Sequence, residues 1–141
     1  MQPRIASAWN DFAPNAGGQV NVEEVAGVFT ATWFQVPEFG VPGTSNSFCC
    51  TLDLATGLIN VFHDQMSIAG ANNGIVGISP GGNLSLANNV DLNVGPNLAL
   101  MPNDAIYEDF TAAVFGPFDL AVSTHIYIPA GGIGTGPYAQ Q

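Results

Sequence analysis

An all-β fold, an antiparallel β-sandwich with a jelly-roll-like topology, is what this sequence of 141 residues predicts. Short segments alternate apolar and polar side chains with period two, as half-buried strands do. Gly and Pro, with 17 and 10 residues, separate these segments, and no heptad pattern, fixed repeat or long amphipathic helix competes with them. One core suffices at this length, so we expect a sandwich domain over residues 1–130 and a flexible Gly-rich tail over residues 131–141.

The first expected strands cover residues 20–25 and 27–36. The second contains Phe29, Trp33 and Phe34, and it is apolar enough for burial on both faces. Pro and Gly residues then predict a loop over residues 37–46.

The clearest hairpin lies at the centre of the chain. Residues 47–54 alternate strictly, and residues 58–63 form the returning strand. The turn between them is Ala55-Thr56-Gly57, where Gly57 can take a positive φ.

Two adjacent cysteines lie in the first strand of this hairpin. Phe48, Cys50, Leu52 and Leu54 are expected to face the core. Ser47, Cys49, Thr51 and Asp53 are expected to face outward. Neighbouring strand residues point to opposite faces, so a disulfide between Cys49 and Cys50 would be strained. The pair gives neither zinc-ligand spacing nor a C-x-x-C redox motif.

Downstream elements are shorter. Strands are expected over residues 74–79, around residues 84–86 and over residues 122–128, with an Asn-rich surface stretch after the second. Residues 104–110 fit a strand and a helical turn equally well, and we expect irregular structure there.

Charge excludes several classes of partner. The net charge is -10, with one Arg (Arg4) and no Lys, so the chain has almost nothing to neutralise nucleic acid or an acidic bilayer. No apolar run approaches the ~20 residues that span a membrane, so membrane insertion is not expected. The 47% apolar content argues against disorder. No secretory signal is present in this sequence, so export depends on a signal outside it.

A series of short segments covers most of the chain: Pro3-Arg4-Ile5-Ala6, Trp9-Asn10-Asp11, Pro14, Ala16-Gly17-Gly18, Val36-Pro37-Glu38-Phe39-Gly40, Asn46-Ser47-Phe48, Gly57-Leu58-Ile59, Gly74-Ile75-Val76-Gly77-Ile78-Ser79-Pro80-Gly81, Ile106-Tyr107-Glu108-Asp109-Phe110 and Pro117-Phe118-Asp119-Leu120. In order and spacing they resemble the nidogen-like β-rich modules of large secreted or surface-anchored bacterial proteins. The resemblance implies an extracellular β-sandwich without known chemistry.

Two departures from that pattern matter. Such modules usually carry further strands upstream of the segment 3–6, so the resemblance implies that this chain is a fragment, a shortened form or a variant that a partner completes. Cys49 and Cys50 stand where the pattern more often continues with Gln after Phe, and they have no assigned role.

Ser79 and His63 are the candidates for chemistry. Ser79 lies in Gly77-Ile78-Ser79-Pro80-Gly81, which matches the G-x-S-x-G nucleophile elbow. That motif requires a strand that runs into a helix, whereas Pro80 and the Gly residues after it predict a turn. His63, beside Asp64, and His125 could act as a base or a metal ligand, but two His do not complete a zinc site.

Acidic and aromatic residues suggest other sites. Paired carboxylates among Glu108, Asp109 and Asp119 would suit glycoside hydrolysis, and the acidic Asn-rich stretch 88–91 offers oxygen ligands for calcium without an EF-hand spacing. Solvated turns are the simpler interpretation of both. A sugar-stacking platform would draw on Trp9, Trp33, Tyr107, Tyr127 and Tyr138, of which Tyr138 is expected to be exposed. Asn83-Leu84-Ser85 matches a glycosylation sequon.

The sequence therefore supports a non-enzymatic extracellular binding or adhesion module of a bacterial surface protein, with a protein or glycan ligand. The alternative is a structural subunit of an extracellular assembly or filament, in which strand edges pair with other copies. A Ser hydrolase that uses Ser79 is the least favoured hypothesis. No catalytic, cofactor-binding or metal-binding residue is assigned, and no cofactor is expected.

Overall fold

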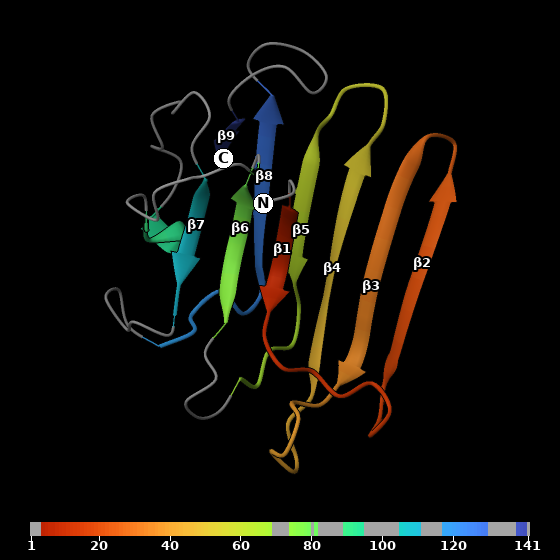
Figure 1. The fold of residues 1–141 in the computed structure, drawn as a ribbon, viewed down its shortest axis with the longest axis vertical. Coiled ribbons are helices and arrows are strands. Elements are labelled where there is room, and N and C mark those ends of the chain that lie inside the picture. Colours follow the sequence, from red (N-terminus) through yellow and green to blue (C-terminus); the bar gives the residue numbers. More distant parts are fainter. Residues whose placement is uncertain are drawn as a thin grey trace.

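The computed structural model describes residues 4–68, 74–79, 81, 89–94, 105–110 and 117–129, and the course of the backbone over 138–140. It confirms the predicted β-sandwich. Two antiparallel sheets are present, a larger one in the order β2-β3-β4-β5-β8-β9 and a smaller one in the order β1-β6-β7 (Figure 1). The strands are Arg4–Trp9 (β1), Gln19–Val25 (β2), Val28–Val36 (β3), Asn46–Asp53 (β4), Ile59–His63 (β5), Ile75–Ser79 (β6), Ile106–Asp109 (β7), Ser123–Pro129 (β8) and Tyr138–Gln140 (β9), and one 3-10 turn, η1, covers Leu92–Val94.

Turn chemistry at two hairpins explains the course of the larger sheet. The two residues between β2 and β3, Ala26 and Gly27, have φ values of 52° and 80°, which are those of the turn that matches strand twist. Between β4 and β5, Asp53 Oδ1 accepts the backbone N–H groups of Ala55 and Thr56 at 2.8 and 2.9 Å. Gly57 takes the predicted positive φ, 74°.

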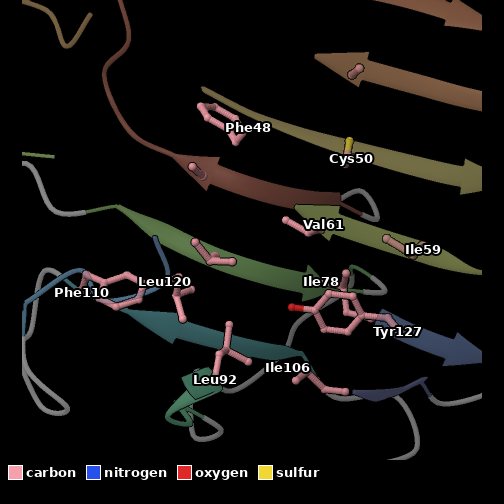
Figure 2. Close-up of a cluster of buried hydrophobic side chains, with 13 residues drawn as sticks. Phe48, Cys50, Ile59, Val61, Ile78, Leu92, Ile106, Phe110, Leu120 and Tyr127 are labelled. Atoms are coloured by element: carbon pink, nitrogen blue, oxygen red, sulfur yellow. The ribbon is translucent and has the colours of Figure 1, made fainter. Parts of the chain in front are cut away.

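The core lies between the two sheets. Figure 2 shows Phe48, Cys50 and Val61 of the larger sheet on one side, and Ile78 and Ile106 of the smaller sheet on the other. The predicted register of β4 is confirmed for the cysteines, since Cys50 is buried and Cys49 is partly exposed. The prediction is wrong at both ends: Leu54 is 47% exposed because it lies beyond the end of β4, and Ser47 is buried because its backbone bonds to Asp64 and Gln65. Both cysteines are free thiols.

Gly77 allows the two neighbouring strands of the smaller sheet to approach closely. It pairs with Ala6 of β1 and Tyr107 of β7. A Cβ atom at this position would lie 2.1 Å from the backbone oxygen of Ile106, and the φ of Gly77 is 146°. A side chain there is therefore excluded by both contact and backbone conformation.

Three further sequence-based expectations are corrected. The irregular structure expected at residues 104–110 is wrong, because Ile106–Asp109 forms β7. The first strand, Arg4–Trp9, was not predicted. The expected burial of β3 on both faces is also wrong, since Phe29 is 37% exposed and Phe34 is 52% exposed. Phe29 lies on the inner face but beyond the edge of the smaller sheet, and Phe34 faces solvent on the outer side of the larger sheet.

Some expectations fall outside the described residues. The strand around residues 84–86, most of the Asn-rich stretch after it and residues 131–137 of the Gly-rich tail lie there. The end of that tail is described in part, and Tyr138–Gln140 pairs with β8 as the last strand of the larger sheet. Among the described residues, no helix has the length and apolar character needed to cross a bilayer.

Candidate functional site

The larger sheet continues past the smaller one, and this leaves part of its inner face uncovered. In Figure 1 β2 and β3 extend to one side, and no strand of the smaller sheet overlaps them. The register places Val20, Val22 and Phe29 on the same face as the core residues of β4. Their exposed fractions are 40%, 62% and 37%. The three side chains form an apolar surface next to the core, which we call the uncovered inner face.

Two acidic residues border this surface. Glu23 and Glu24 are consecutive in β2 and both are exposed. Because neighbouring strand residues point to opposite faces, Glu24 shares the inner face with Val22, and Glu23 lies on the outer face. No Lys or Arg lies in β2, β3 or the turn between them. The end of the strand therefore carries negative charge on both faces.

The backbone of β2 is open on its outer side. β2 ends the order of the larger sheet, so within the described part of the chain its only strand partner is β3. A two-residue turn makes Val25 and Val28 a hydrogen-bonded pair, and such pairs alternate along an antiparallel ladder. The N–H and C=O groups of Val20, Val22 and Glu24 consequently point away from β3. An open edge of this kind can pair with another chain.

A buried polar cluster links the sheets at another place. His63 Nε2 donates to the backbone oxygen of Ser7 in β1 at 2.6 Å, and its Nδ1 lies 3.3 Å from Ser123 Oγ in β8. The Ser123 hydroxyl also lies 3.0 Å from His125 Nε2 and donates to the Leu120 carbonyl at 2.5 Å. A carbonyl only accepts, so the hydroxyl proton is directed at Leu120 and not at either imidazole.

Burial controls the protonation of this cluster. Desolvation lowers the pKa of His63 to about 4, the Ser7 carbonyl raises it in part, and the nearby His125 lowers it further. Desolvation also lowers the pKa of His125, against the opposing effect of Asp119. Both imidazoles are thus held neutral near pH 7, and they are closed to solvent with exposed fractions of 0% and 4%. The cluster joins β1, β5 and β8 and presents no reactive atom to a substrate.

Ser79 is not assembled into a nucleophilic site. Its hydroxyl accepts the backbone N–H of Gly81 at 3.2 Å, as in a strand-end turn. Ser79 pairs with Arg4, whereas His63 bonds to Ser7, three residues further along the same strand. That separation is about 10 Å at the rise of an extended chain, beyond the reach of a general base.

The acidic candidates are divided between interior and surface. Glu108 is buried, and its carboxylate accepts the backbone N–H of Leu92 at 2.9 Å. Desolvation raises its pKa to about 7; the Leu92 N–H opposes this, and Asp119 and Asp91 add to it. Asp119 is exposed. Asp109 is half-buried. Of the three carboxyl groups, that of Glu108 is closed to solvent, with 2% of the residue exposed.

The stretch proposed as calcium ligands uses its oxygens within the chain. Asn89 Oδ1 accepts the backbone N–H of Asp109 at 2.8 Å, and Asp91 Oδ1 accepts that of Asn93 at 3.0 Å. Asn88 lies outside the described residues. In the described ranges, no group of three or more His, Cys, Asp and Glu side chains is placed to hold a metal ion.

The aromatic candidates do not form one platform. Tyr107 and Tyr127 are buried, and Trp33 stacks on Phe48 with ring centroids 4.8 Å apart. Trp9 is 55% exposed, but the Arg4 guanidinium lies 4.7 Å from its ring centroid. The side chain of Tyr138 and the sequon 83–85 lie outside the described part.

The open edge and the uncovered face were not singled out from the sequence. The available signal was a Val-x-Val pair followed directly by two Glu residues at positions 23 and 24. Ser123 was also missed, since its contact with His63 joins residues 60 positions apart. Comparison of the chain with known protein families, with curated proteins and with solved structures gives no match in any of the three.

Proposed function

We propose that this protein is a non-enzymatic binding module of an extracellular bacterial surface protein, and that it binds a polypeptide partner at the β2 end of its larger sheet. The observation that carries the proposal is the uncovered inner face, in which Val22 is 62% exposed directly beside a strand edge without a partner among the described strands. The sequence resemblance to nidogen-like modules supports the extracellular location.

The alternative is a structural subunit that assembles through the same edge. When β2 pairs antiparallel along its full length with β2 of a second copy, Glu23 lies opposite Asn21 and Glu24 lies opposite the apolar Val20. Neither strand contains a cation to offset them, and each copy carries a net charge of -10. Pairing of two copies thus leaves both Glu residues without a counter-charge, and chains of the same sign repel each other, so a different partner fits this edge better.

Two valines of β2 provide a matched test. Val22 and Val25 are each 62% exposed, but Val22 lies on the uncovered inner face and Val25 on the outer face. Labelled wild type, Val22→Thr and Val25→Thr would be applied to an array of extended peptides and to a glycan array. We expect peptide binding that Val22→Thr weakens about tenfold, because its hydroxyl would be buried unpaired, and that Val25→Thr retains.

Three outcomes would contradict the proposal. They are binding to glycans alone, binding to peptides that both variants retain equally, and absence of binding on both arrays. Size-exclusion chromatography with light scattering tests the alternative on the same samples. A binding module elutes with the mass of one chain, 14.6 kDa, whereas a mass that rises with concentration would support the structural subunit.

A further inference from the structure

We infer that the partner is an extended segment in which apolar residues alternate with polar ones and in which adjacent Lys or Arg residues meet Glu23 and Glu24. This segment adds to the larger sheet as a further strand beside β2. The inference rests on the proposed function and specifies the chemistry of the partner. Its basis is the combination of open backbone groups, an uncovered apolar face and uncompensated charge at one strand.

The backbone sets the conformation of the partner. The outward N–H and C=O groups belong to every second residue, Val20, Val22 and Glu24. Such groups repeat at about 6.7 Å in a strand, so only another extended chain can bond to all of them in turn. A helix or a compact loop cannot match this spacing. A partner that spans β2 therefore needs about seven residues in β conformation.

The side chains set the pattern of the partner. On an added strand, alternate residues would continue the inner face that Val20 and Val22 leave open, and Phe29 lies on the same face one strand further in. Apolar side chains opposite the two valines remove apolar surface from water on both partners. The partner residue between these two apolar residues lies on the outer face beside Asn21. A polar side chain suits the exposed surroundings there.

The charges select among segments that share this pattern. Glu24 and Glu23 lie on opposite faces, so consecutive cationic residues of the partner would each meet one carboxyl group. The chain has no Lys, and Arg4, its one Arg, lies over Trp9 in the smaller sheet. The field of a chain with a net charge of -10 also attracts a cationic segment and accelerates its association.

Three synthetic peptides of one length separate these contributions. The cationic probe is Thr-Lys-Lys-Val-Thr-Val-Thr, which places its two valines opposite Val20 and Val22 in antiparallel register. The acidic probe replaces both Lys by Glu, and the neutral probe replaces them by Ser. Each is titrated into ¹⁵N-labelled full chain while amide chemical shifts are followed. We expect the cationic probe to shift the amides of β2 and to bind about tenfold more tightly than the neutral one.

Two variants of the protein test the same contacts from the other side. The double substitution Glu23→Lys/Glu24→Lys should invert the order of the cationic and acidic probes. Val22→Pro removes an N–H that points away from β3, so it should abolish binding of all probes while the β3 ladder remains intact. If Val22→Pro fails to fold, as judged by its amide spectrum, the charge reversal alone decides, because both Glu side chains are exposed.

The outcomes distinguish this inference from the function on which it rests. Binding of all three probes at β2 with equal affinity would overturn the cationic partner and leave strand addition in place. Absence of any β2 shift with every probe would overturn both. Shifts confined to residues outside β2 and β3 would place binding elsewhere and overturn the inference as well. A wild-type mass that rises with concentration would identify a second copy as the occupant.

Discussion

Acidification from pH 7 to pH 5 should change the contributions of His63 and Glu108 to the stability of this protein in opposite directions, because burial disfavours the charged form of each group. The pKa of His63 is lowered to about 4, from an ordinary value of 6.5. Its stabilising contribution is therefore complete above pH 6.5 and is lost as the pH falls toward 4. The pKa of Glu108 is raised to about 7, from 4.5. Its contribution is complete below pH 4.5 and is lost as the pH rises through 7.

The two magnitudes follow from the pKa differences between the folded and unfolded chain. Each difference is 2.5 units (6.5 to about 4, and 4.5 to about 7). Between pH 7 and pH 5, linkage gives a loss of about 2 kcal/mol from His63 and a gain of about 2 kcal/mol from Glu108. These two contributions nearly cancel, so the loss expected for the whole chain over this interval is that of His125, whose pKa burial also lowers. Either group alone would give a slope of about 1 kcal/mol per pH unit.

Single substitutions separate the two slopes. Glu108→Gln keeps an oxygen that can accept the Leu92 N–H but does not titrate, so this variant should lose at least about 2 kcal/mol between pH 7 and pH 5, because the losses from His63 and His125 are no longer opposed. In His63→Gln the gain of about 2 kcal/mol from Glu108 remains, reduced by the loss from His125. The free energy of unfolding is measured by urea titration at four pH values. Equal pH slopes for wild type and Glu108→Gln would refute the reasoning, whatever the absolute stabilities.

Further substitutions test the packing, each by urea titration. Cys50→Ser should destabilise the fold by about 1 to 3 kcal/mol, and Cys49→Ser by less than about 0.5 kcal/mol; equal effects would contradict the register of β4. Ala26→Gly should stabilise by about 1 kcal/mol, because Ala26 has a φ of 52°; a loss of stability would argue against this turn. Gly77→Ala should cost about 3 kcal/mol through contact with the Ile106 backbone, and a neutral result would show that β6 and β7 lie further apart.

Local signals account for the parts of the fold that the sequence predicted. The hairpin of β4 and β5 was predicted because its alternation, the Asp53 turn and the positive φ of Gly57 depend only on neighbouring residues. β7 was missed because it buries the acidic residue Glu108, which breaks the apolar alternation. That burial depends on an N–H of Leu92, 16 residues away. β1 carries small residues, Ser7 and Ala8, in its buried part, so its apolar pattern is weak.

The candidate site was less predictable than the fold. Whether Phe29 is covered depends on how far the smaller sheet extends over the larger one, and this is set by strand pairing between distant segments. The sequence of β3 shows the same alternation of apolar and polar residues whether Phe29 is covered or exposed. The polar cluster is also non-local, since His63 reaches Ser7 across 56 residues. Sequence alternation therefore predicted which face of a strand is apolar, but not which apolar faces meet a partner within the chain.

Native-state amide hydrogen exchange over residues 19–25 tests the central claim most directly, because it reports which backbone groups of β2 lack a partner. The open edge predicts that the amides of Val20, Val22 and Glu24 exchange at rates close to those of an unfolded chain. Those of Asn21 and Glu23, which point toward β3, should be protected. On addition of the cationic peptide, the first three should become protected as well. Uniform protection along β2 in the isolated protein would show that the edge is already paired, and it would contradict the account.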